Sequence, residues 1–194
     1  MTAQDHRDAA RSPVQAGEPE KLEEGIALCL SGGGYRAMLF HVGAIWRLNE
    51  LRYLPKLDRI SSVSGGSITA GVLGLHWPRL GFDEDGLAHD FDQQFVRPIR
   101  SLASKTIDQG SVLGGILARG TISDKVAMAY RKHVFGSAGL KNLPDRPRFV
   151  INATNVQTGA LWRFSKPYMA DYKVAKRSDA DRYRQAAVVT VADG

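Results

Sequence analysis

Two short apolar segments in the first half of the chain each run into a glycine-rich turn, and a helical pattern follows each turn. Residues 25–30 (GIALCL) lead into Ser31-Gly32-Gly33-Gly34, and residues 59–63 (RISSV) lead into Ser64-Gly65-Gly66. Apolar residues then recur at spacings of three and four over residues 35–51, which predicts an amphipathic helix, and Ser67 is expected to cap a helix through residue 75. This order of strand, turn and helix predicts an α/β fold with a mostly parallel central sheet.

The rest of the chain carries weaker patterns. Residues 83–96 and 122–135 are predicted to be helices, and residues 148–154 and 160–164 to be strands joined by a turn at Thr158-Gly159. Residues 1–24 lack apolar periodicity and are expected to be a flexible leader, with one domain over residues 25–194. The 194 residues are 43% hydrophobic and 24% charged, which fits one globular domain and excludes a disordered, collagen-like or coiled-coil chain.

Charge and cysteine content limit the partners and the compartment. The leader has a net charge of 3 − 6 = −3, so the remainder carries 6 + 3 = +9, which favours anionic partners. No nucleic-acid-binding motif is present, and nucleic acid is not an expected partner. The single cysteine, Cys29, builds no disulfide framework and is expected to be buried in its strand and inert. No apolar run reaches ~18–20 residues and no signal peptide is visible, so we expect a cytoplasmic protein that is soluble or peripheral at a membrane.

The second turn resembles a nucleophile elbow, the sharp strand-to-helix bend G-x-S-x-G that exposes a catalytic serine. Here the sequence is Ser62-Val63-Ser64-Gly65-Gly66, with serine in place of the first glycine. Ser64 is the candidate nucleophile because it follows the apolar strand directly, and the helix behind it favours developing negative charge. The alternative interpretation is a tight connection with no catalytic role.

The first turn places several backbone N–H groups at a helix N-terminus. Such groups bind an anion, which is either a phosphate or the oxyanion of a tetrahedral intermediate. Gly32-x-Gly34-x-x-Ala37 also fits the dinucleotide fingerprint, with Glu50 downstream, but the end of the second strand holds serine and valine where the acidic ribose ligand belongs. A P-loop is excluded because no Lys-Ser or Lys-Thr pair follows the glycines.

Taken together, the two turns resemble the patatin-like phospholipase family. The matching segments are residues 25–37 (GIALCLSGGGYRA), 40–44 (FHVGA), 61–67 (SSVSGGS) and 152–159 (NATNVQTG). The resemblance implies a three-layer α/β/α fold whose C-terminal part could be incomplete here. It also implies lipid acyl hydrolysis by a Ser–Asp dyad, with the glycine loop as oxyanion hole. Ala37 stands where the family usually has glycine.

The general base is expected near the end of the chain. No histidine follows His133, so the Ser, Asp/Glu, His order of ordinary α/β-hydrolases is not met. The resemblance implies an aspartate in an Asp-Gly-Gly or Asp-Gly-Ala motif, and the chain ends in Asp193-Gly194. Asp193 is therefore the candidate base; the alternative is a frayed terminal turn.

These observations lead to one principal hypothesis and two alternatives. In the principal one, Ser64 attacks an ester of a phospholipid or other glycerolipid, Asp193 accepts its proton, and N–H groups of Gly32, Gly33, Gly34 and Gly65 hold the oxyanion. Arg36 is a candidate contact for a substrate phosphate or a support of the glycine loop, and the lipid substrate is compatible with peripheral membrane contact. No metal or cofactor is expected, because no metal-ligand spacing occurs. The alternatives are a dinucleotide-binding oxidoreductase and a catalytically inactive lipid-surface module.

Overall fold

The two strand–turn–helix units form in the predicted order. In the computed structural model, which describes residues 24–104, 127–166 and 168–170, β1 (Ile26–Leu30) leads to α2 (Gly34–Glu50), and β2 (Leu57–Val63) leads to α3 (Gly65–His76). Helix α3 begins two residues before the expected cap Ser67, because Ser64 is its N-cap residue. The other described elements are the 3₁₀ turns Leu54–Lys56, Trp77–Arg79 and Leu140–Asn142, the π-helical segments Asp92–Val96 and Arg131–Phe135, α4 (Arg97–Ala103), β3 (Arg148–Thr154), β4 (Leu161–Ser165) and β5 (Tyr168–Ala170).

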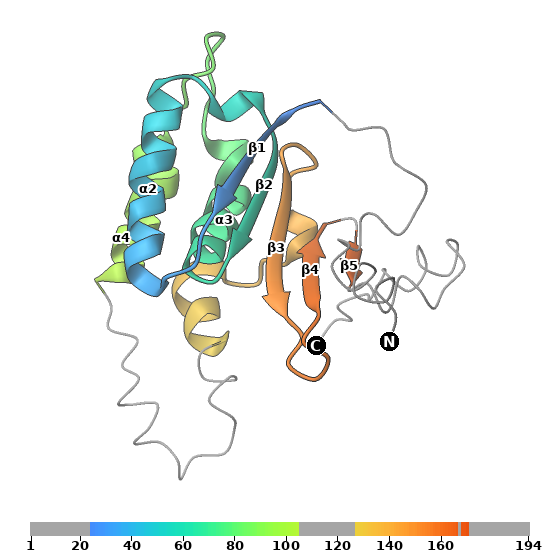
Figure 1. Cartoon of the computed structure of the whole chain (residues 1–194). Coiled ribbons are helices and arrows are strands. Elements are labelled where there is room, and N and C mark those ends of the chain that lie inside the picture. The colour runs from blue at the N-terminus through green and yellow to red at the C-terminus, as the bar shows by residue number, and fades with distance from the viewer. Residues whose placement is uncertain (1–23, 105–126, 167, 171–194) are drawn as a thin grey trace.

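The five strands form one sheet in the order β1-β2-β3-β4-β5 (Figure 1). Strands β1, β2 and β3 are parallel, whereas β4 and β5 extend the sheet in antiparallel fashion. The carboxyl ends of the three parallel strands therefore lie along the same edge of the sheet, the edge that runs across the strand ends at the bottom in Figure 1. This confirms the predicted α/β class and its parallel centre.

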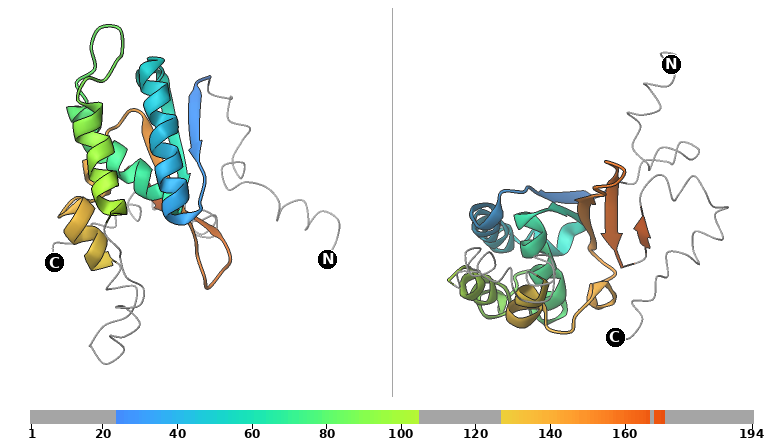
Figure 2. Two further views of the ribbon diagram at one scale, coloured as in Figure 1. Left: turned by 90° about the vertical axis from the view of Figure 1, so that its left-hand side faces the viewer. Right: turned by 90° about the horizontal axis from the view of Figure 1, so that it is seen from below.

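The described helices pack on one face of the sheet. Figure 2 shows α2, α3 and α4 on the same side of the strands. Leu30, Ile60 and Phe149 point toward these helices and are buried in the core. These helices account for one of the two predicted helical layers.

The expectation that Cys29 is buried is wrong. Cys29 is exposed, because β1 is an edge strand and alternate residues of a strand point to opposite faces. Cys29 therefore lies on the face that none of the described helices covers.

The expected helix over residues 83–96 is correct only in its second part. Residues 83–90 form a turn with an isolated bridge between Phe82 and Ala88, and the helix starts at Phe91. The side chain of Asn49 on α2 donates to the carbonyl of Ala88 and accepts from its N–H, at 3.1 and 2.9 Å. A contact between residues 39 positions apart thus keeps this segment from forming a helix. The apolar periodicity of the sequence does not reveal such a contact.

Two further observations complete the fold. Of the expected helix over residues 122–135, residues 127–135 are helical and the first five lie outside the described residues. Within the described part of the chain, no helix combines the length and the apolar character needed to cross a membrane.

Candidate active site

Ser64 lies at the sharp turn between β2 and α3. Its backbone has φ 52° and ψ −122°, a left-handed conformation that an L-amino acid rarely adopts. Ser64 is exposed, whereas the hydroxyls of Ser62 and Ser67 on either side are buried without a hydrogen-bond partner among the described residues. The turn therefore presents one serine hydroxyl to solvent and hides its neighbours.

The glycine loop after β1 touches this turn directly. An ideal Cβ built on Gly32 would lie 3.1 Å from Cβ and 3.7 Å from Oγ of Ser64. A Cβ on Gly65 would overlap the carbonyl oxygen of Gly34, and one on Gly66 would lie 2.6 Å from that of Ser31. The two turns are thus packed backbone to backbone, at a separation that only glycine allows.

Helix α2 starts within the glycine loop. Gly33 is its N-cap residue with φ 137°, and Gly34 follows with φ 61°. The N–H groups of the first helical turn have no carbonyl acceptor within the helix, and the helix dipole adds positive potential there. The same holds for Gly65 and Gly66 at the start of α3. Two helix N-termini therefore meet beside the Ser64 hydroxyl, an arrangement that favours an anion.

The side chains of His41 and Asn152 hold the two turns in place by hydrogen bonds, a role that the sequence patterns do not predict. His41 on α2 is 5% exposed, and its Nε2 lies 3.0 Å from the carbonyl oxygen and 3.3 Å from Oγ of Ser31. Asn152 on β3 donates from Nδ2 to Oγ of Ser61 at 2.9 Å and to the carbonyl of Ser62 at 3.1 Å. The sequence offers one sign of this role: each of the two is a polar residue at a position that its apolar neighbours predict to be buried.

Two other candidate residues lie differently. Arg36 is exposed in the first turn of α2, and no ion pair involves it in the described ranges. Asp193 lies outside the described residues. Within them, no His, Asp or Glu side chain hydrogen-bonds to the Ser64 hydroxyl, so this part of the chain contains the candidate nucleophile and the candidate oxyanion donors without a candidate base beside them.

Two tyrosines lie near the glycine loop. Burial raises the pKa of Tyr35 on α2. Burial also raises the pKa of Tyr130, and repulsion from the phenolate form of Tyr35 raises it further. Both hydroxyls are therefore neutral at physiological pH and can act as hydrogen-bond donors.

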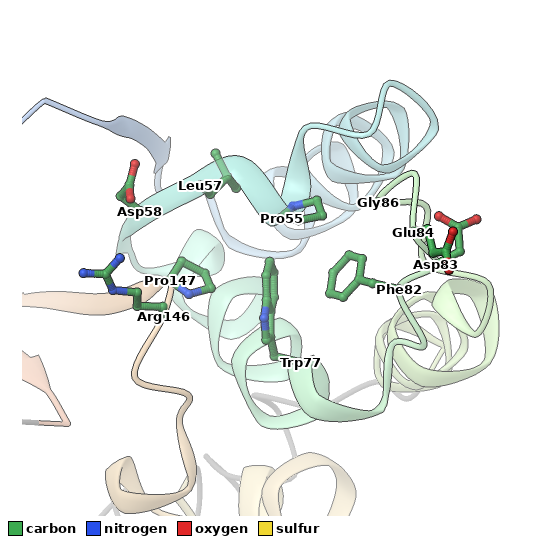
Figure 3. A pocket seen from close by; sticks show the side chains of 10 residues that line it. All are labelled: Pro55, Leu57, Asp58, Trp77, Phe82, Asp83, Glu84, Gly86, Arg146 and Pro147. Carbon is green, nitrogen blue, oxygen red and sulfur yellow. The ribbon is translucent and has the colours of Figure 1, made fainter.

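The cavity drawn in Figure 3 lies at the other edge of the sheet. It has a volume of about 350 Å³ and is lined by Leu57 and Asp58 at the start of β2, by Trp77 after α3 and by Pro147 before β3. Ser64 follows the carboxyl end of β2, so the cavity and Ser64 lie at opposite ends of the strands. Among the described residues, no three His, Cys, Asp or Glu side chains gather as a metal ion would require.

Comparison with known proteins identifies similar sequences and folds. Residues 28–190 match the family model of patatin-like phospholipases. A solved structure of human GIVD cytosolic phospholipase A2, in complex with methyl gamma-linolenyl fluorophosphonate inhibitor and terbium chloride, is similar with a TM-score of 0.53 and 18% identity. The match covers 77% of this chain and 24% of that chain. A second structure of the same human protein, with the fluorophosphonate, gives a TM-score of 0.48, 19% identity and the same coverage. No curated protein sequence matches significantly.

Proposed function

The chain belongs to the patatin-like phospholipase family, and from this premise we propose that it is a serine hydrolase that cleaves lipid esters. One observation carries the proposal: the exposed, left-handed Ser64 lies against Gly32, so that nucleophile and oxyanion donors share one site. A tight connection with no catalytic role does not account for a strained serine with an exposed hydroxyl between two buried ones.

The proposed reaction begins with attack of Ser64 Oγ on the ester carbonyl carbon. The carbonyl oxygen becomes an oxyanion, which the backbone N–H groups of Gly32–Gly34 and Gly65 stabilise by hydrogen bonds. The tetrahedral intermediate collapses to an acyl-enzyme and releases the alcohol, and a water molecule then hydrolyses the acyl-enzyme to the fatty acid. His41 acts in this proposal as a positioning residue, which keeps the glycine loop in place through its contacts with Ser31.

We propose Asp193 as the general base. A carboxylate with an ordinary pKa of ~3.9 is ionised at neutral pH, and it can accept the proton of Ser64 if it is placed beside Oγ. The same carboxyl group then returns the proton to the leaving alcohol. The support for this role is the Asp193-Gly194 pair, which corresponds to the first two residues of the Asp-Gly-Gly or Asp-Gly-Ala motif that the family resemblance implies.

A phospholipid or another glycerolipid is the proposed substrate. The exposed guanidinium of Arg36, at the N-terminus of α2, offers a contact for a headgroup phosphate. The dinucleotide alternative is less well supported, because the end of β2 holds Val63 and Ser64 where a carboxylate for the ribose belongs.

Release of fatty acid from phosphatidylcholine and from a soluble p-nitrophenyl ester tests the proposal. We expect Ser64→Ala to reduce turnover to background and Asp193→Asn to lower kcat by about 100-fold or more. Ser67→Ala is the matched control, because it removes a buried hydroxyl from the same turn, and it should keep wild-type turnover. Unchanged turnover in Ser64→Ala would contradict the proposal. A folded wild-type protein with no esterase activity would also contradict it, and would favour the inactive lipid-surface module.

A further inference from the structure

The carboxylates of the described residues are gathered at one edge of the sheet. All described Asp and Glu residues lie toward the amino ends of the parallel strands: Glu24 before β1, Glu50 at the end of α2, Asp58 at the start of β2, the carboxylates of residues 83–92, and Asp145 before β3. No acidic residue occurs in the glycine loop at residues 31–34, in the Ser64 turn or in residues 148–166. The edge that carries Ser64 therefore has no negative side chain among the described residues.

Cationic side chains, in contrast, occur at both edges, the Ser64 edge included. Arg36 lies in the first turn of α2, and Arg131 and Lys132 lie on the helical segment after residue 127, which approaches the edge from below in Figure 1. All three are exposed, and none forms an ion pair with a carboxylate of the described residues. A net positive field at one end of the molecule attracts an anionic surface and orients the molecule toward it.

Exposed apolar side chains also lie on the segments that meet at this edge. Val156 is 95% exposed in the turn between β3 and β4, which projects at this edge in Figure 1. Val63, directly before Ser64, and Met128 are also exposed. Apolar side chains interspersed with cations and free of carboxylates are the composition of a surface that enters the headgroup region of a bilayer.

We propose that the edge formed by the glycine loop, the Ser64 turn, the β3–β4 turn and residues 127–132 is a docking surface for an anionic phospholipid bilayer. The proposal rests on the proposed function, because it places the ester bonds of the bilayer next to Ser64. Val156 and Met128 enter the headgroup region, and Arg131 and Lys132 contact lipid phosphates. Docking in this orientation turns the acidic edge, with the cavity of Figure 3, away from the bilayer.

Sedimentation of the full chain with vesicles tests the proposal independently of catalysis. We expect binding to mixed phosphatidylcholine–phosphatidylserine vesicles, little binding to pure phosphatidylcholine vesicles, and a decrease in binding as salt is raised. Removal of two cations with Arg131→Gln/Lys132→Gln should weaken binding by about tenfold or more. Val156→Ser should weaken it by a smaller factor, through loss of apolar contact.

The matched control removes two cations from the other edge. Arg52→Gln/Arg79→Gln should bind as the wild type does, although its net charge changes by the same amount. Equal loss of binding in both double variants would overturn the proposal, since it would show an effect of net charge alone. Equal binding to neutral and anionic vesicles would overturn it too, as would self-association of the chain through Val156 in sedimentation velocity without lipid.

The vesicle assay separates this proposal from the proposed function. The Ser64→Ala variant should bind vesicles as the wild type does while it hydrolyses no ester. Hydrolysis of the soluble ester by Arg131→Gln/Lys132→Gln should be unchanged, because both residues lie outside the nucleophile and oxyanion groups. Intact hydrolysis without vesicle binding would overturn the docking surface alone, and vesicle binding without hydrolysis would overturn the proposed function alone.

Discussion

At the scale of single residues, the backbone of Ser64 combines strain with exposure. A non-glycine residue with φ 52° and ψ −122° costs of order 1–3 kcal/mol, which the surrounding structure must offset. Asn152 contributes to that support, because it hydrogen-bonds to Ser61 and Ser62 just before the turn. The conformation aims a hydroxyl outward at the junction of β2 and α3, so the protein gives up stability for the position of one side chain.

This strain leads to a prediction about stability. Ser64→Gly is expected to be more stable than Ser64→Ala by about 1 kcal/mol, because relief of the left-handed strain outweighs the greater entropy of glycine in the unfolded chain. Urea denaturation of the two variants measures the difference. Both variants lack the hydroxyl, so they should be equally inactive. A Ser64→Ala variant as stable as Ser64→Gly would show that Ser64 is not strained.

At the scale of elements, two glycine turns on neighbouring parallel strands hold each other in place. Strands β1 and β2 pair Cys29 with Ser61 and Leu30 with Ser62, which brings the residues that follow them to the same height. Thr69 Oγ1 on α3 then donates to the carbonyl of Met38 on α2 at 3.1 Å, so that the two helices are also joined. The proposed oxyanion donors and the proposed nucleophile are thus brought together by strand register.

A pair of glycine variants tests this packing. Gly65→Ala should destabilise the fold by about 1–3 kcal/mol and abolish turnover, because its Cβ would overlap the carbonyl oxygen of Gly34. Gly43→Ala is the control: it lies in the same kind of element, on α2, with no atom within 4 Å of the new Cβ. It should stabilise the protein by about 0.5–1 kcal/mol, as alanine favours helix over glycine. Thermal unfolding of both variants measures this, and a neutral Gly65→Ala would contradict the packed turns.

The sequence predicts these elements well because each depends on local patterns. The apolar periodicity of α2 and the short apolar runs of β1 and β2 need no distant contact to be recognised. The contact of Gly32 with Ser64 depends on strand register, and the bond from His41 to Ser31 depends on which face of α2 is buried. Neither of these is encoded within a window of neighbouring residues. The open segment at residues 83–90 escapes prediction for the same reason, since it depends on Asn49.

At the scale of the whole molecule, the described carboxylates are distributed unevenly between the two edges of the sheet. One edge of the sheet holds the described carboxylates, part of the cations and the cavity, whereas the other holds Ser64 with cations, exposed apolar side chains and no described carboxylate. The sequence predicts a basic body but not this separation, because the arrangement of charges depends on where each element begins and ends in space. The composition alone therefore favours any anionic partner, whereas the fold favours one that approaches the Ser64 edge.

The most direct test of the account is the site at which a fluorophosphonate reacts. The nucleophile displaces fluoride from phosphorus, and the adduct can be located by mass spectrometry of peptides from the full chain. We predict one adduct, on Ser64, that is absent in Ser64→Ala and retained in Ser67→Ala. Labelling that persists in Ser64→Ala, or that maps to another serine in the wild type, would contradict the assignment of Ser64 as the nucleophile.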